Sequence, residues 1–508
     1  MTPVKTILWY GRSPQTGIRY RLERRGFSIV ENPEREKIED HLLGITHIVV
    51  IDHTGGVVEG ASLSYDLIPM FIDHAIRVLV LGGDRTSILE NHLHKFDKEY
   101  PWDNIVLFLP DLKDTNFDNI LEAPSKEHWR GFLIKQIGNF EKLTSEDLRL
   151  VRRAFPKAEE VHLRKISDGL SGSRVFMAHE KRLETETSIA HWTQPRLLKA
   201  GDRSSMSKEV GAMRAVSPFV PFELRPNLEV HVEGFKRAIY IADFVDKSDS
   251  MLDAARAGRA EAAISNLFNR TLHRWRDRAR QCPMVTGSLV EAAERLGVLT
   301  LSSIQNEYLE TERIQQLRLD FEALWKELSN HTFQYRAATI HGDLHGDNVR
   351  VRGDDAILID LGAVKGDTTP GHGAPLCFDV AILEVALIFA YREIDGKDEF
   401  EQNDWEAETR PFYDLDAILR SPSIDSAPDP GSWMFGCLQR IRAFGIYEQS
   451  HEYEYPIALV IALWRWCKFP PLSKGGADKG RRVVALELGA KIIQQIAERE
   501  SGKSKASS

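Results

Sequence analysis

The 508-residue sequence is poor in cysteine, with Cys282, Cys377, Cys437 and Cys467 lying far apart and no CxxC pair among them. This spacing argues against a disulfide framework or a zinc ribbon and favours reduced thiols. The sequence also lacks a long apolar run, because its most apolar late segment, 457–464, is much shorter than the roughly 20 residues that cross a bilayer. The start, MTPVKTILWYGRS, carries no signal-peptide pattern. We therefore expect a cytoplasmic protein without membrane association.

An excess of basic residues is also missing. The formal net charge is −9, whereas a dedicated non-specific nucleic-acid binder needs a basic surface. We therefore expect no nucleic-acid partner. Hydrophobic residues make up 42% and charged residues 28% of the chain, which is typical of a globular protein and excludes collagen-like and mostly disordered chains. The length predicts two to four domains.

Residues 1–140 alternate between short apolar runs and helix-like segments. The runs predict five strands, at 6–10, 27–30, 46–51, 76–81 and 105–109, and helices are expected at 17–25, 64–74, 87–98 and 126–137. Apolar runs without polar alternation are typical of strands buried on both faces of a parallel sheet. The pattern predicts an α/β domain with a doubly wound parallel sheet.

The character of the sequence changes after residue 140. We expect a helical connector at 141–159, a region rich in strands at 160–248, a mainly helical region at 249–498 and a flexible tail at 499–508. A loop rich in Ser, Pro, Asp and Gly interrupts the helical region at 421–432. This second part is predicted to be α+β, with a smaller strand-rich portion and a larger helical one.

The stretch 340–362, IHGDLHGDNVRVRGDDAILIDLG, carries the most informative pattern. Two short strand-like runs flank a turn at 353–355, which predicts a hairpin. Asp343 and Asn348 precede this hairpin and Asp360 follows it, so the three side chains should meet at one rim. Oxygen ligands for Mg²⁺ beside a carboxylate that orients an attacking hydroxyl are what phosphoryl transfer requires. Zinc on His341 and His345 is an alternative, although the glycines between and after them disfavour a helix there.

The segment HGDLHGDN followed by IDLG resembles the catalytic and metal-binding loops of the aminoglycoside phosphotransferase/choline kinase-like superfamily, which is related in fold to protein kinases. The Asp-to-Asn spacing also matches the protein-kinase catalytic loop. The resemblance covers about 160–490 and implies a bilobal kinase-like fold that uses ATP and Mg²⁺. It implies that Asp343 is the catalytic base, that Asn348 and Asp360 bind the metal, and that His345 belongs to the nucleotide site.

The same resemblance implies further residues upstream. A turn between two strands would hold the ATP phosphates, a lysine at the end of an apolar run would contact the α- and β-phosphates, and an acidic residue ten positions on would orient that lysine. A hinge after the next strand would hold adenine through its backbone. The matching residues are Gly169, Ser171, Gly172 and Ser173 for the turn, Lys199 and Glu209 for the pair, and Asp243, Phe244 and Val245 for the hinge.

Downstream, Asp379 begins a segment, FDVAILE, that resembles the helix after the metal loop, where the aspartate braces the catalytic loop. Leu361 departs from the aromatic residue often found after the metal aspartate, and no Ala-Pro-Glu segment of the protein-kinase type is present. These departures favour the small-molecule kinase branch. The tryptophans Trp405, Trp433, Trp464 and Trp466 could line a cationic acceptor site, but such helical tryptophans more often belong to the core.

The domain at 1–140 resembles a response-regulator receiver, with Asp52 at the position of the phospho-acceptor. A receiver also needs an acidic pair after its first strand to bind Mg²⁺, and this chain has Gly11, Arg12 and Ser13 there. We therefore expect a degenerate receiver-like regulatory domain, which would bind a protein partner.

The sequence thus predicts an ATP- and Mg²⁺-dependent phosphotransferase that acts on a hydroxyl of an unidentified small-molecule or protein acceptor. Two alternatives remain open. One is a nucleotide-binding signalling or scaffold protein, which the fused regulatory domain favours. The other is transfer of AMP instead of the γ-phosphoryl group on the same fold.

Overall fold

The computed structural model describes residues 5–33, 46–54, 67–73, 76–82, 106–109, 133–138, 143–168, 173–183, 190–308, 317–366, 372–390, 393–394, 397–398, 402–420, 433–467 and 480–506, together with Ile38 and apart from Pro156 and Phe235. The chain divides into two compact units. The first comprises 1–210 and 228–244, and the second comprises 211–227 and 245–508.

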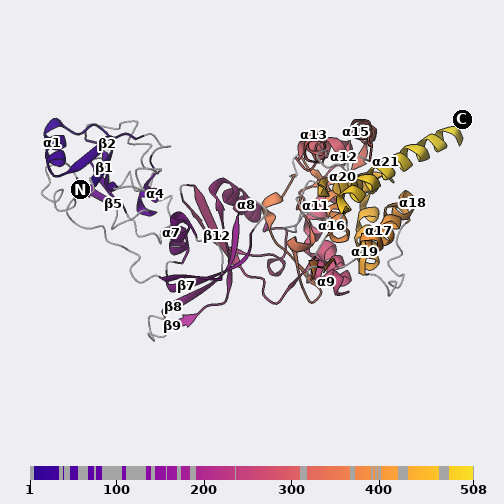
Figure 1. The fold of residues 1–508 in the computed structure, drawn as a ribbon, viewed down its shortest axis with the longest axis horizontal. Helices are drawn as coiled ribbons and strands as arrows, with labels where there is room; N and C mark the ends of the chain where they lie inside the picture. The colour runs from indigo at the N-terminus through magenta and orange to yellow at the C-terminus, as the bar shows by residue number, and fades with distance from the viewer. Residues whose placement is uncertain are drawn as a thin grey trace. The chain divides into compact units, whose positions relative to one another are not determined.

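The first unit begins with a five-stranded parallel sheet in the order β2-β1-β3-β4-β5 (Figure 1). Its strands are β1 Lys5–Gly11, β2 Phe27–Glu31, β3 Thr46–Asp52, β4 Arg77–Leu81 and β5 Val106–Leu109, with helices α1 Thr16–Arg24 and α4 Ile68–Asp73. The five predicted strands are confirmed. The strand order is that of flavodoxin-like doubly wound folds, while the assignment as a receiver stays a prediction.

Burial explains why these strands read as continuous apolar runs. Alternate residues of one strand lie in two different clusters: Leu8 and Tyr10 pack in one, and Ile7 and Trp9 in the other. Because successive side chains of a strand point to opposite faces, both faces of the sheet are covered. The helix expected at 87–98 lies outside the described residues. The helix expected at 126–137 is wrong at its end, where Leu133–Ile137 forms strand β6.

Strand β6 belongs to a second sheet of seven strands, in the order β11-β12-β10-β8-β7-β6, with β9 paired to β8. The pairs are antiparallel except β6 with β7. The other bounds are β7 Ala158–Asp168, β8 Arg174–Leu183, β9 Ala190–Trp192, β10 Arg196–Asp202, β11 Leu228–Glu233 and β12 Arg237–Asp243. Helix α7, Ser145–Ala154, buries Leu150 and Val151 against this sheet. The expected helical connector, 141–159, thus contains a helix that packs on this sheet and contributes to its hydrophobic cluster.

Helix α8, Arg203–Val216, follows β10 directly, and its beginning contacts the hairpin of β11 and β12. Ser207 donates to a carboxylate oxygen of Glu233 at 2.6 Å, and Arg203 forms an ion pair with the same carboxylate at 3.0 Å. On the other side, Arg153 of α7 donates to the Glu233 carbonyl at 2.9 Å. Glu233 therefore ties both helices to one end of the sheet.

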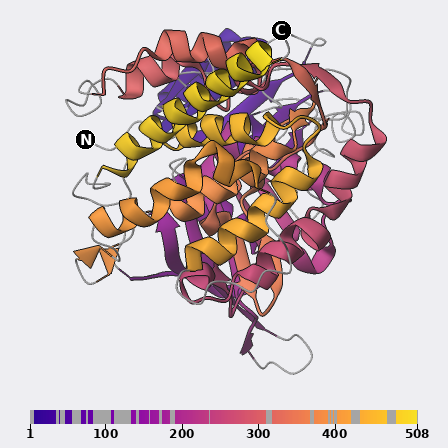
Figure 2. The ribbon, with the colours of Figure 1, turned by 90° about the vertical axis from the view of Figure 1, so that its right-hand side faces the viewer.

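The second unit is mainly helical (Figures 1 and 2). Its principal helices are α9 Met251–Arg256, α10 Glu261–Asn266, α11 His273–Gln281, α12 Leu289–Arg295, α13 Leu301–Tyr308, α15 Phe321–Asn330, α16 Cys377–Ile388, α17 Gln402–Thr409, α18 Leu415–Leu419, α19 Trp433–Glu448, α20 Glu454–Trp466 and α21 Arg481–Ala506. A π-helical turn, Leu267–Thr271, joins α10 to α11. Helix α21 extends to Ala506, into the tail that the sequence predicts to be flexible.

The core of this unit forms where α16, α19, α20 and α21 pack together. Every residue from Glu454 to Trp464 of α20 is buried. A three-stranded sheet lies beside the helices, in the order β13-β17-β18, with β13 Asp249–Ser250, β17 Val349–Arg352 and β18 Asp355–Leu358. Among the described residues, no helix is both long enough and apolar enough to span a membrane.

Candidate active site

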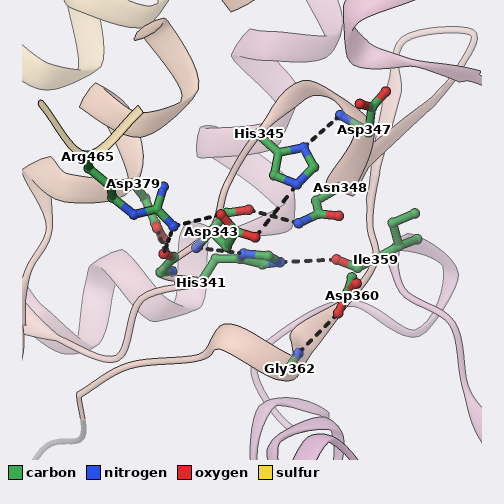
Figure 3. A network of polar contacts seen from close by, with 11 residues as sticks. His341, Asp343, His345, Asp347, Asn348, Ile359, Asp360, Gly362, Asp379 and Arg465 are labelled. Carbon is green, nitrogen blue, oxygen red and sulfur yellow. Dashed lines mark hydrogen bonds and ion pairs between the residues drawn. The ribbon is translucent and has the colours of Figure 1, made fainter. Parts of the chain in front are cut away.

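The loop 341–348 is held in place by hydrogen bonds to its backbone. Asp379, in the first turn of α16, accepts hydrogen bonds from the amides of His341 at 2.7 Å and Gly342 at 2.9 Å (Figure 3). Gly342 has a φ of +77°, and a Cβ there would lie 2.4 Å from the carbonyl oxygen of Ala363, so the position requires glycine. Asp379 thus braces the loop, as the sequence predicts.

The hairpin that follows the loop is also confirmed. β17 and β18 pair antiparallel around Gly353, and the Ile359 amide donates to the Asn348 carbonyl at 2.9 Å. Asn348 is buried and donates through Nδ2 to the backbone oxygen of Asp343 at 2.9 Å. Asp360 follows β18 in a left-handed conformation, with φ of +52°. The structure therefore brings Asp343 and Asn348 together and places Asp360 at the same end of the hairpin (Figure 3).

Asp343 lies among several charged groups. Arg465, near the end of α20, donates through Nη2 to Asp343 Oδ1 at 2.7 Å and to the Gly342 carbonyl at 3.2 Å. His345 Nε2 lies 3.7 Å from Asp343 Oδ2. Burial alone would raise the pKa of Asp343, but the positive charge of Arg465 and the nearby His345 outweigh it, so the pKa is below the ordinary value. Asp343 is therefore ionised at neutral pH.

His345, in the same loop, differs from Asp343 in that burial dominates its pKa. Its Nδ1 accepts a hydrogen bond from the Asp347 amide at 3.3 Å. Burial lowers the pKa of His345, although the carboxylates of Asp343 and Asp347 act in the opposite direction. The sequence assigns His345 to the nucleotide site, and the structure places its ring beside the Asp343 carboxylate.

The donor set at the hairpin suits a hard cation better than zinc. The Nδ2 of Asn348 is used within the protein, which leaves its Oδ1 as an acceptor, and the Asp360 carboxylate is exposed. Amide and carboxylate oxygens are ligands that Mg²⁺ prefers. His341, by contrast, directs Nε2 at the Ile359 carbonyl at 3.1 Å and accepts at Nδ1 from the Asp343 amide at 3.3 Å. Both of its nitrogens are occupied, which argues against the zinc alternative.

A second set of predicted residues lies in the first unit. Lys199 of β10 and Glu209 of α8 form an ion pair at 2.9 Å, with side chains only 6% and 5% exposed. The Tyr240 hydroxyl, from β12, donates to Glu209 Oε1 at 2.8 Å. Two ions this deeply buried are stable only because they pair with each other and with further hydrogen-bonding groups.

The remaining predicted positions are partly described. Ser173 is buried directly before β8, whereas Gly169, Ser171 and Gly172 lie outside the described residues. The predicted hinge begins where β12 ends, at Asp243, which is exposed, and continues through Phe244 and Val245, which are half-buried.

Two of the four tryptophans considered for an acceptor site are core residues. Trp405 and Trp464 are fully buried, and their indole nitrogens donate to the carbonyls of Ile388 at 2.9 Å and Leu486 at 3.3 Å. Trp433 and Trp466 are half-buried. The core interpretation is therefore confirmed for the first two.

Arg465 is the site residue that the sequence analysis missed. It lies 122 positions from Asp343 in the sequence and belongs to no motif. Its only mark in the sequence is that this arginine directly follows the apolar segment 457–464.

No family model and no curated protein matches this chain. Among solved structures, a glucosamine kinase in complex with glucosamine, ADP and inorganic phosphate aligns over 66% of this chain and 92% of its own, with 10% sequence identity and a TM-score of 0.32. An aminoglycoside-3'-phosphotransferase of type VIII aligns over 58% of this chain and 97% of its own, with 18% identity and a TM-score of 0.32. Both similarities are weak.

Proposed function

We propose that this protein is an ATP- and Mg²⁺-dependent phosphotransferase that moves the γ-phosphoryl group of ATP to a hydroxyl of a small-molecule or protein acceptor. The observation that carries the proposal is the loop 341–348, in which Asp343 and Asn348 are joined by a hydrogen bond next to Asp360. An ionised carboxylate beside two hard oxygen donors is the set of groups that phosphoryl transfer uses.

Asp343 acts on the acceptor. Its carboxylate accepts a hydrogen bond from the acceptor hydroxyl, orients the oxygen in line with the γ-phosphorus and takes up the proton as the new P–O bond forms and the bond to ADP breaks. Its low pKa makes it a weak base, which suits a loose transition state in which orientation matters more than proton removal. General-base groups contribute about 10²–10⁴-fold to rate.

Asn348 and Asp360 would hold Mg²⁺, which supplies charge neutralisation at the phosphates when it is bound. Lys199 would contact the α- and β-phosphates, and Glu209 would orient it through the 2.9 Å ion pair. Backbone groups of 243–245 would hold adenine, and the turn containing Gly169, Ser171, Gly172 and Ser173 would cover the phosphates. His345 would contribute to the nucleotide site from its place beside Asp343.

We further propose that residues 1–140 regulate this activity through α7. Buried Asp147 of α7 accepts from Arg174, the first residue of β8, and from Arg237 of β12 at 3.0 Å. Helix α7 follows the parallel-sheet domain in the sequence and contacts the strand that leaves the predicted phosphate-binding turn. A change in α7 would therefore alter nucleotide affinity, and Asp147→Asn should raise the KM for ATP.

The deciding experiment measures Mg²⁺-dependent ATP consumption by the full chain and identifies the nucleotide product. Asp343→Ala and Asp360→Ala are the test variants, and Asp354→Ala, on the exposed turn of the same hairpin, is the matched control. ADP formation that both test variants abolish and the control retains supports the proposal. AMP or a covalent adenylate as product would indicate nucleotidyl transfer. ATP binding without turnover, even with cell extract as a source of acceptors, would favour the scaffold alternative.

A further inference from the structure

Arg465 lies at an unusual place in its helix. The preceding residues of α20, from Glu454 to Trp464, are all buried, and Arg465 is in the last turn with a side chain that is 12% exposed. Removing a guanidinium from water costs free energy unless its hydrogen bonds are replaced. Here one nitrogen, Nη2, bridges the Gly342 carbonyl and Asp343 Oδ1.

This bridge joins a backbone group to the carboxylate of the next residue. Among the described residues, Arg465 is the group that hydrogen-bonds the Asp343 carboxylate, because the other contact, from His345, is 3.7 Å long. The bridge restricts the side-chain torsions of Asp343. It engages Oδ1 and leaves Oδ2 on the side of His345 (Figure 3).

The helix that carries Arg465 is itself held firmly. Helices α16 and α20 pack against each other, and the Tyr455 hydroxyl at the start of α20 donates to Glu384 of α16 at 2.8 Å. The loop therefore receives two supports from one helix pair. Asp379, at the start of α16, holds its backbone amides, and Arg465, at the end of α20, holds its carboxylate.

We propose that Arg465 is a positioning residue that fixes the Asp343 carboxylate through Oδ1, so that Oδ2 is presented to the acceptor hydroxyl. This inference rests on the proposed function and assigns to it a residue from outside the sequence motifs. One nitrogen makes both contacts, so a lysine could supply the charge and a donor. Its flexible stem would hold the carboxylate less firmly than the pre-organised guanidinium, so we expect lysine to keep the positioning only in part.

The test compares Arg465→Met and Arg465→Lys with the unchanged protein. Arg440→Met is the matched control, because it removes an arginine–carboxylate ion pair, with Glu261 at 3.4 Å, from α19 of the same unit. Two measurements are made on each full-length chain: kcat and KM for ATP, and hydrogen exchange of the backbone amides in peptides that cover 340–348. The second does not need catalytic turnover.

For Arg465→Met, we expect kcat to fall about 10²-fold, the usual effect of misplacing a reacting group by about 1 Å, with the KM for ATP unchanged within about twofold. Exchange at 340–348 should become faster, Arg465→Lys should lie between, and Arg440→Met should match the parent. Unchanged kcat, unchanged exchange at 340–348, or a parallel loss in all peptides would each overturn the inference. If the parent protein turns over no ATP, the proposed function fails, and hydrogen exchange still decides whether Arg465 positions the loop.

Discussion

Replacing Lys199 with methionine tests how the first unit depends on its buried ion pair. The substitution keeps the apolar stem and removes the charge, which leaves the Glu209 carboxylate in a site where it is only 5% exposed. Removing one partner of a buried ion pair typically destabilises a protein by about 3–5 kcal/mol. The Tyr240 hydroxyl still donates to Glu209 at 2.8 Å, so we expect the lower end, about 3 kcal/mol.

Hydrogen exchange measures this loss of stability in individual segments of the chain. Peptides from β10, α8 and β12 report the opening of the sheet that contains the pair, while peptides from 245–508, in the second unit, serve as an internal reference. Because 1.36 kcal/mol corresponds to a factor of ten in an equilibrium constant, about 3 kcal/mol predicts exchange roughly 10²-fold faster in these three elements. Residues 245–508 should exchange at their former rate.

The double variant Lys199→Met/Glu209→Gln separates burial of an unpaired charge from loss of attraction. Glutamine is neutral and still accepts from Tyr240, so most of the lost protection should return, since the buried unpaired charge is then gone. If the single variant exchanges like the parent, or if the double variant exchanges faster than the single one, the pair does not stabilise the sheet in this way. Its role would then lie only in binding the nucleotide.

Three further predictions concern the second unit. Burial raises the pKa of Glu454 to about 7, so the native state retains a proton that the unfolded chain releases. The free energy of unfolding should therefore decrease as the pH rises from about 4.5 to 7, by at most about 3 kcal/mol. Glu454→Gln should flatten that decrease in thermal unfolding. Asp379→Ala should leave two loop amides without acceptors, at about 1–3 kcal/mol each, with faster exchange at 340–348. Arg442→Met should leave the fully buried carboxylate of Glu384, its partner at 2.8 Å, without its ion pair. We expect a loss of about 3–5 kcal/mol in urea unfolding, and a smaller loss for Arg442→Met/Glu384→Gln.

The parts of the structure that the sequence predicted well are those encoded locally. The five parallel strands appear as apolar runs because each is covered on both faces. The hairpin after Asn348 is marked by Gly353, whose φ of +61° few other residues adopt. Lys199 and Glu209 are ten residues apart, so one strand and the helix after it determine their contact.

Strand β6 shows how a local pattern misleads. Its sequence is Leu-Ile-Lys-Gln-Ile, and two of its three apolar residues lie on the exposed face. Leu133 is 47% and Ile137 is 38% exposed, whereas Ile134, between them, packs against the core. Because the strand pairs in parallel with β7 more than twenty residues later, its conformation is set by a partner that no short window contains.

The same reasoning explains why Asp379 was predicted and Arg465 was not. Asp379 begins a helix with a pattern of its own, and its role follows from where that helix starts. Arg465 is a single charge after an apolar run, and only the packing of α20 against α16 brings it to the loop. Motifs identify groups that share a local segment, whereas a residue that orients such a group can come from any element that packs nearby. A charged residue next to a fully buried helical segment therefore indicates a polar partner nearby, because burial of a charge requires one.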